Sequence, residues 1–427
     1  MPAESQPEGL PQNPAELLGV LPDRWRVLHL VLCVVRLWFQ PCRNGPTISA
    51  AFAAEGHDPA RENGVSASGE RAQPPDCMRE SNCLTWIVVK PFIPPKPLRN
   101  GHLMTIAASF WRRRFPRLPA SVTRPFDVEP GTRVRGECHW QPHSKKHPTL
   151  VLLHGLEGSS ESGYMLGTAE KAWIAGFNVV RLNQRNCGGT QHLTESLYHS
   201  GLSGDIRAVV MELIARDGLA KVFAAGFSMG GNLVLKMAGE FGDLAPPSLC
   251  GFVALAPSVD LAGCAHALEE PSNFFYERHF VRRMKRRMRE KARLYPHRYP
   301  IGEMHEIHTV RGFDEAITAR FCGFHNAADY YARSSAIRII QNIRKPTLVI
   351  AAQDDPVVPF AAFENPAIRE NPHITLLVPK HGGHCAFISK ESGDERFWSE
   401  ARIVEFCAAQ AASHHAEPRA TSQAKSD

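Results

Sequence analysis

The chain lacks the marks of a zinc protein and of a repeat protein. Its 11 cysteines form none of the closely spaced pairs that a zinc site needs, so we expect most of them to be buried free thiols. No internal repeat is visible, and no nucleic-acid-binding signature accompanies the net charge of +6. These absences exclude a zinc-held fold and a repeat array, and they argue against a nucleic-acid partner.

The first 77 residues carry little that predicts a packed core. Their apolar segment, Val27 to Phe39, spans about 13 residues, whereas a membrane-spanning helix needs about 20. Arg24 and Arg26 precede the segment as in a signal peptide, but no small-residue cleavage site follows it. We expect a disordered or poorly packed extension at 1–77, with membrane insertion or secretion as the alternative. Met78 is then a candidate internal start.

Most of the remaining chain alternates between apolar runs and helical patterns. Hydrophobic residues make up 43% of the sequence, enough for the core of one large domain. After N-terminal strands expected within 86–148, the pattern predicts strands at 149–154, 177–182, 221–225, 251–256, 346–352 and 374–378, and helices near 161–175, 204–216 and 230–240. This is typical of an α/β fold, a mostly parallel central sheet flanked by helices, in which loops at one sheet edge bind the ligand.

The alternation is interrupted between Pro257 and Arg344. About 85 residues separate two strands there, far more than a βαβ connection needs. We therefore predict a helical cap at 258–344, inserted between two parts of the core at 78–257 and 345–412, and a disordered tail at 413–427. The cap has enough aromatic side chains to pack itself and to line an apolar cavity: Phe274, Phe275, Tyr276, Phe280, Phe313, Phe321, Phe324, Tyr330 and Tyr331.

A candidate nucleophile lies where a predicted buried strand meets a predicted helix, at Gly226-Phe227-Ser228-Met229-Gly230. So sharp a turn forces the central residue into strained dihedrals and lifts its hydroxyl clear of the sheet. Ser228 is therefore the candidate. The same pattern also occurs by chance as a small-residue turn, so the prediction depends on a base and an acid elsewhere in the chain.

The acid is expected after the strand at 346–352, which ends in Asp354-Asp355-Pro356. We favour Asp355, because the proline that follows biases it toward an extended conformation. Asp354 is then expected to be a turn or capping residue.

The base is expected after the strand at 374–378, which runs into His381-Gly382-Gly383-His384. We favour His384 over His381, because the two glycines before His384 allow the loop to fold over the serine.

The strand at 149–154 ends in His-Gly-Leu, and its loop is suited to aim a backbone amide at the serine. The amides of Leu156 and Met229 would then form a two-donor oxyanion hole. His154 precedes the serine, and we expect it to support the loop through hydrogen bonds. Cys187 follows the predicted strand at 177–182, which is too early in the chain for a nucleophile, and it lacks the sharp strand-to-helix turn of Ser228. We therefore interpret it as a small residue in a tight loop.

Nine Lys or Arg and one Glu lie between Arg278 and Arg293, with Met284 and Met288 at helical spacing. A solvated face of a cap helix is the commonest outcome for such a segment. Contact with an anionic membrane surface is the main alternative.

Several motifs in this order resemble the YheT-like branch of the α/β-hydrolases over roughly residues 86–407. They are Pro91–Pro95, Asn100–Thr105, His154–Gly158, Asn183–Gly189, Gly226–Asn232, Asp354–Pro356 and His381–His384, together with the cap phrases Gly312–Glu315 and Ala328–Tyr331. The chain departs from the branch at Asn186, where glycine is more common.

The resemblance implies an α/β-hydrolase fold and a serine carboxylester hydrolase of the short-chain esterase or monoacylglycerol lipase type, with phospholipases among eukaryotic relatives. It implies Ser228, Asp355 and His384 as the catalytic triad, and no metal or organic cofactor. We expect a small-molecule or lipid ester as substrate, no nucleic acid, and a cytoplasmic location. Peripheral membrane contact through 278–293 and the oligomeric state stay open.

The same residues are compatible with functions other than ester hydrolysis. A thioesterase, an amidase or an acyltransferase would share the triad, and a non-catalytic lipid-binding scaffold is the alternative from a different class. Ser228 at the elbow excludes a dehalogenase or epoxide hydrolase with an aspartate nucleophile.

Overall fold

The computed structural model describes residues 89–302 and 304–413. The predictions for residues 1–77, for Met78 and for the tail beyond 413 lie outside these residues.

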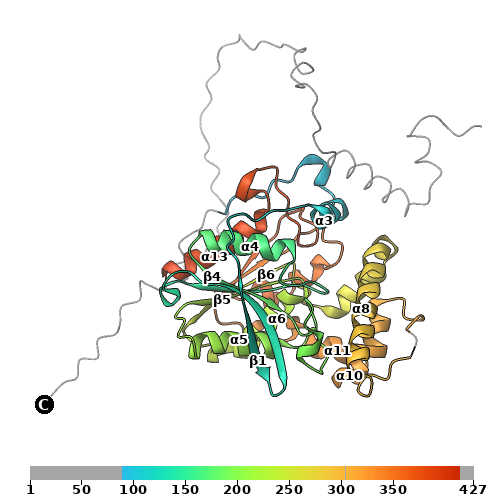
Figure 1. The fold of residues 1–427 in the computed structure, drawn as a ribbon. Helices are drawn as coiled ribbons and strands as arrows, with labels where there is room; N and C mark the ends of the chain where they lie inside the picture. Colours follow the sequence, from blue (N-terminus) through green and yellow to red (C-terminus); the bar gives the residue numbers. More distant parts are fainter. Residues whose placement is uncertain (1–88, 303, 414–427) are drawn as a thin grey trace, which may run out of the picture. The chain divides into compact units, whose positions relative to one another are not determined.

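An eight-stranded sheet forms the centre of the fold, in the order β1-β2-β4-β3-β5-β6-β7-β8 (Figure 1). Its strands are β1 (Val122–Glu129), β2 (Thr132–His139), β3 (Thr149–Leu153), β4 (Asn178–Asn183), β5 (Val222–Phe227), β6 (Leu249–Leu255), β7 (Thr347–Ile350) and β8 (Ile374–Leu377). β2 pairs antiparallel with β1 and with β4, and every other neighbouring pair is parallel. The predicted mostly parallel α/β sheet, an α/β-hydrolase fold, is confirmed.

Helices cover both faces of the sheet. α4 (Gly163–Ile174) and α13 (Trp398–Ser413) pack on one face, while α5 (Ser203–Ala215) and α6 (Met229–Phe241) pack on the other (Figure 1). Every residue of β3, β5 and β6 is buried, which explains why these strands read as continuous apolar runs and not as alternating ones.

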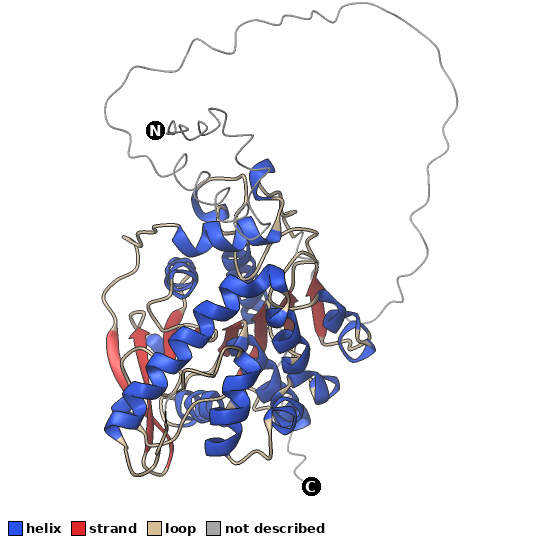
Figure 2. Ribbon diagram, turned by 90° about the vertical axis from the view of Figure 1, so that its right-hand side faces the viewer, coloured by secondary structure: helices blue, strands red, loops and turns tan. Residues whose placement is uncertain are grey.

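The chain between β6 and β7 is helical. It contains α7 (Leu261–Glu269), the long α8 (Phe274–Leu294), α9 (Val310–Phe313), the π-helix η6 (Asp314–Ala319), α10 (Arg320–Cys322) and α11 (Ala327–Ser334). These helices lie beside the sheet in Figure 1, and Figure 2 views them from their own side. We call this part of the chain the cap.

The shorter elements connect these layers. They are α3 (Gly101–Phe110), α12 (Pro366–Arg369), and the 3₁₀ turns Lys96–Leu98, Ser144–Lys146, Gln191–Leu193, Gly242–Leu244, Pro271–Asn273, Ala336–Arg338, Ile340–Asn342, Phe360–Glu364 and Gly393–Glu395. Within the described residues, no helix is both long enough and apolar enough to cross a bilayer.

Candidate active site

Ser228 lies on the turn between β5 and α6 with strained backbone dihedrals, φ 52° and ψ −119°. The flanking glycines are required by space. A Cβ on Gly226 would lie 2.2 Å from the Gly230 carbonyl oxygen, and a Cβ on Gly230 would lie 2.4 Å from the His154 carbonyl oxygen. The turn therefore has the geometry of a nucleophile elbow, and Ser228 keeps partial exposure to solvent.

Ser228, His384 and Asp355 form a continuous hydrogen-bonded chain. His384 Nε2 lies 2.9 Å from Ser228 Oγ, and His384 Nδ1 lies 2.9 Å from Asp355 Oδ2. The Asp355 side chain is only 2% exposed, and its Oδ1 accepts hydrogen bonds from the amides of Val357 and Val358 at 2.8 and 3.0 Å. This arrangement holds one histidine nitrogen toward the carboxylate and leaves the other facing the hydroxyl.

Asp354 and His381, the alternatives considered for acid and base, contact each other. His381 Nδ1 lies 3.2 Å from Asp354 Oδ2, and the Gly383 amide donates to Asp354 Oδ1 at 3.0 Å. Asp354 therefore does more than the turn or capping role expected for it, because its carboxylate ties the β7 loop to the histidine loop.

The Asn100–Thr105 motif supports both loops, a role that sequence analysis missed. Thr105 Oγ1 accepts the His384 amide at 2.8 Å and donates to the Gly101 carbonyl at 2.7 Å. A Cβ on Gly101 would lie 1.8 Å from the Asp354 carbonyl oxygen, and one on Gly383 would lie 2.6 Å from the Gly101 carbonyl oxygen. Only glycines allow α3 to approach the acid and base loops so closely.

The loop after β3 approaches the nucleophile in the same way. A Cβ on Gly155 would lie 3.1 Å from Ser228 Cβ. The amides of Leu156 and Met229 donate no hydrogen bond within the described part of the chain, so both donors are free to meet a developing oxyanion.

His154 is fully buried and supports this loop, as expected for it. Its Nε2 accepts the Gln184 amide at 3.1 Å, and its Nδ1 contacts the Gly155 carbonyl at 2.8 Å. Burial lowers the pKa of His154 to about 4, so the ring is neutral at physiological pH.

The residue after Leu156 is held by the cap. Glu157 has φ 57°, and its carboxylate forms a buried ion pair with Arg287. Tyr198 Oη donates to that carboxylate and accepts the Glu157 amide, both at 3.2 Å, while Arg283 donates to the Glu157 carbonyl at 2.6 Å. Two cations of α8 and one tyrosine thus fix the backbone beside the candidate oxyanion donor.

Lys291, one turn further along α8, holds the neighbouring loop. Its buried ammonium donates to Asn186 Oδ1 and to the Gln191 carbonyl, each at 2.8 Å, and to the Thr194 carbonyl. Asn186 has φ 63°, a left-handed conformation that asparagine tolerates better than most residues, which accounts for its presence where glycine is more common.

The expectation of a simply solvated basic helix was therefore incomplete. Arg283, Arg287 and Lys291 recur every four residues and contact the loops beneath α8. Of the other cations of the segment, Lys285 is half-buried, and Arg278, Arg282, Arg286, Arg289 and Arg293 are exposed. The one available signal that this side of the helix faces inward was spacing, since Arg287 lies three residues after the apolar Met284 and Lys291 lies three residues after Met288.

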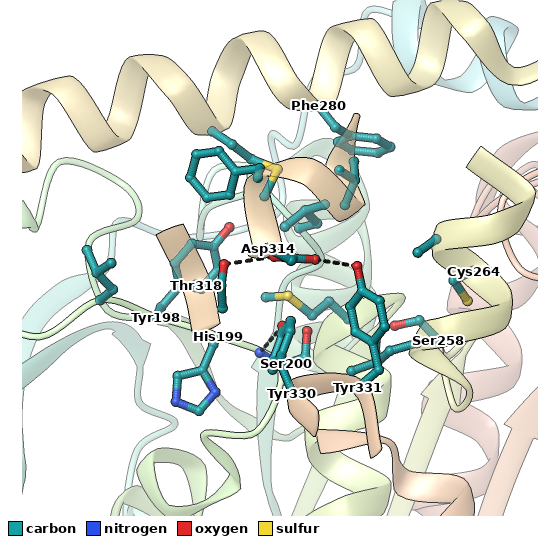
Figure 3. Close-up of a pocket in the computed structure, with 18 of the residues that line it drawn as sticks. Tyr198, His199, Ser200, Ser258, Cys264, Phe280, Asp314, Thr318, Tyr330 and Tyr331 are labelled. Atoms are coloured by element: carbon teal, nitrogen blue, oxygen red, sulfur yellow. Dashed lines mark hydrogen bonds between the residues drawn. The ribbon is translucent and has the colours of Figure 1, made fainter. Parts of the chain in front are cut away.

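Two cavities meet at Ser228. One of about 100 Å³ lies under the cap and is lined mostly by apolar side chains, including Leu261, Met284 and Phe313. Figure 3 shows this cavity, with Phe280 and Tyr331 among the labelled residues of its wall. The other, of about 630 Å³, is lined by Tyr276, His384 and residues of α3. Of the cap aromatics considered in the sequence, Phe280, Phe313, Tyr330 and Tyr331 line the smaller cavity, whereas Phe274 and Phe275 are exposed.

Cys187 is buried, and burial raises the pKa of its thiol to about 11, which leaves it protonated and a poor nucleophile. Each of the seven cysteines in the described residues is free, and five of them are buried. Within the same residues, no group of three or more His, Cys, Asp or Glu is arranged to hold a metal ion.

Comparison with known proteins places this geometry in context. Residues 150–397 match the alpha/beta hydrolase family. The chain is 31% identical over 318 residues to the putative esterase YheT of Escherichia coli (strain K12), an alignment that covers 74% of this chain and 92% of that protein.

Two eukaryotic relatives that carry enzyme names align over a shorter part of the chain. The monoacylglycerol lipase of Saccharomyces cerevisiae is 30% identical over 261 residues, which is 59% of this chain and 57% of the yeast protein. The phospholipase ABHD3 of Mus musculus is 27% identical over 242 residues, covering 56% of this chain and 58% of the mouse protein.

Proposed function

The chain belongs to the alpha/beta hydrolase family, and from this premise we propose that it is a serine carboxylester hydrolase acting on acyl esters through a Ser228-His384-Asp355 triad. The observation that carries the proposal is the hydrogen-bonded chain from Ser228 Oγ through both nitrogens of His384 to the buried Asp355. A serine that only closed a small turn would not need a histidine and a carboxylate aligned with its hydroxyl.

The proposed reaction begins when Ser228 Oγ attacks the ester carbonyl and His384 Nε2 takes the hydroxyl proton. Asp355 fixes the histidine tautomer and stabilises the imidazolium that forms. The amides of Leu156 and Met229 donate to the tetrahedral oxyanion, and the proton on His384 passes to the leaving alcohol. Water activated by His384 then hydrolyses the acyl-enzyme and regenerates Ser228.

Lipid esters are the proposed substrates. The relatives include proteins named esterase, monoacylglycerol lipase and phospholipase, and the smaller cavity beside Ser228 is mostly apolar. Burying an acyl chain there would contribute about 0.8 kcal/mol per methylene group to binding.

The test is labelling with a fluorophosphonate probe, beside hydrolysis of p-nitrophenyl esters of increasing chain length. Wild type should label and hydrolyse, and Ser228→Ala should do neither. A folded wild type that neither labels nor hydrolyses would refute the proposal and favour a non-catalytic scaffold. Hydrolysis of thioesters or amides far ahead of matched esters would assign the same triad to a different bond.

Peripheral membrane contact belongs to the same proposal. Six exposed arginines of α8, Arg283 among them, lie on the same helix as the exposed Phe274 and Phe275, a combination typical of interfacial binding. Sedimentation with vesicles should increase with anionic lipid and fall with added salt. Sedimentation that responded to neither would rule out contact through this face.

A further inference from the structure

The smaller cavity beside Ser228 contains a carboxylate among apolar walls. Asp314 is 5% exposed and lines the cavity together with Ser228 (Figure 3). Within the described residues no lysine, arginine or histidine forms a salt bridge with it, and Arg311, which lies three residues before it, pairs instead with Glu269. A buried carboxylate without a cation is costly unless hydrogen-bond donors satisfy it.

Among the residues that the structure describes, two side-chain donors reach the carboxylate of Asp314. Thr318 Oγ1 donates to its Oδ1 at 2.7 Å, and Tyr331 Oη donates to its Oδ2 at 2.8 Å (Figure 3). A carboxylate has about four lone-pair positions, so acceptor capacity remains. Burial raises the pKa of Asp314 to about 6, which leaves the group mostly ionised at neutral pH.

The backbone at this position is unusual. Asp314 begins the π-helix η6, a rare form that is frequent at functional sites. Asp314 and Tyr331 also come from the two cap phrases, Gly312–Glu315 and Ala328–Tyr331, for which the triad provides no role. The hydrogen bond between their side chains joins the two phrases at the cavity wall.

A second polar group in the cavity has no partner. Ser258 follows β6, and its amide donates to the Ser228 carbonyl at 3.3 Å. The residue is 7% exposed and lines the cavity, yet its Oγ makes no hydrogen bond within the described residues. A buried hydroxyl left unpaired is unfavourable, and a ligand with a polar group would offset that cost.

We propose that this cavity recognises a hydroxyl group on the substrate. The hydroxyl donates a hydrogen bond to Asp314, and Ser258 Oγ is the second polar contact of the substrate in the cavity. The proposal rests on the proposed esterase function, because it names the substrate that the Ser228 site selects. An unsubstituted alkyl chain would leave the carboxylate desolvated without a new donor. An ammonium group would meet Arg287 and Lys291, which line the same cavity.

The hydroxyl could belong to the alcohol or to the acyl chain of the ester, and two matched pairs of substrates separate these sources. The first pair is the glyceryl and the propyl ester of one medium-chain fatty acid. The second is the p-nitrophenyl ester of a hydroxylated fatty acid and that of the plain acid of equal length. For each pair the ratio of kcat/KM is measured on wild type.

We expect wild type to prefer the hydroxylated member of one pair by about tenfold or more, because a hydrogen bond to a charged acceptor is worth about 1.5–3 kcal/mol. Asp314→Asn keeps the shape but replaces the charged acceptor with a weaker neutral one, so the ratio should fall severalfold. Ser258→Ala should lower the ratio by a smaller factor without lowering the unfolding midpoint. Glu315→Gln is the matched control, because Glu315 contacts the Ala327 amide and does not line the cavity.

The outcomes separate this inference from the proposed function. Ratios near one in both pairs, from a wild type that labels with fluorophosphonate and hydrolyses plain esters, would overturn hydroxyl recognition and leave the esterase function standing. A preference that is unchanged in Asp314→Asn would show that Asp314 is not the acceptor. If Asp314→Asn does not fold, the wild-type ratios and Ser258→Ala still decide, because an unchanged ratio in Ser258→Ala would remove that residue from the site.

Discussion

Asp354 and Asp355 are neighbours in sequence, yet each pairs with a different histidine of the same loop. The Asp355–His384 pair is 2% and 12% exposed and contacts Ser228, whereas the Asp354–His381 pair is 22% and 25% exposed and contacts backbone. The buried pair is suited to hold a proton-transfer geometry in a low dielectric, and the half-buried Asp354–His381 pair is suited to join two loops. The two pairs have the same residue types. They differ in burial and in the group that each contacts, Ser228 in one pair and the Gly383 amide in the other.

The largest expected effect comes from removing the charge of the buried pair. Asp355→Asn should lower turnover by about 10⁴-fold, as in other triads, because the amide no longer favours the histidine tautomer that accepts the serine proton. Steady-state hydrolysis of a p-nitrophenyl ester measures it, with the unfolding midpoint as the check on folding. A fall of only a few fold would mean that another group orients His384.

A smaller effect is expected from the support beneath the histidine loop. Thr105→Val removes the acceptor of the His384 amide and leaves a partly buried donor unpaired, which costs about 1 kcal/mol of folding free energy. Misplacement of His384 should lower turnover by about tenfold to a hundredfold. Thr105→Ser keeps the hydroxyl and is the control. Equal activities in the Val and Ser variants would show that the hydrogen bond does not position the base.

The smallest effect is expected at the Asp354–His381 pair. Asp354→Asn keeps an oxygen for the Gly383 amide, so turnover should stay within about threefold of wild type, and stability should change by about 0.5 kcal/mol or less, as is usual for partly exposed ion pairs. The same assays apply. If this variant lost more turnover than Asp355→Asn, the roles of the two aspartates would be reversed.

The centre of the sheet was predictable because its strands β3 to β7 are buried on both faces. β3, β5 and β6 read as apolar runs in the sequence, and chain order predicted the candidate nucleophile after β5, the acid after β7 and the base after β8. The approach of Ser228, Asp355 and His384 follows from the parallel topology, which brings the strand ends to one edge.

The parts that sequence did not predict depend on contacts between distant segments. Thr105 and His384 are far apart in the chain, and no local pattern links them. On α8, Arg283, Arg287 and Lys291 contact the loops beneath the helix, whereas the other five arginines of the helix are exposed to solvent. Both sets consist of basic residues, so composition cannot distinguish them. The π-helix at Asp314 has no propensity signal of its own, because its extra residue per turn is stabilised by tertiary partners such as Tyr331.

The contacts of α8 with Glu157 imply that the cap is not an independent lid. If α8 moved away from the sheet, the carboxylate and the carbonyl of Glu157 would both lose their arginine partners, and the left-handed backbone beside Leu156 would lose what holds it. The closed cap and a rigid loop after β3 therefore form one cooperative unit. A ligand that favours the closed cap favours the ordered loop by the same free energy. An enzyme with its cap open would therefore lack an ordered oxyanion donor and would be inactive.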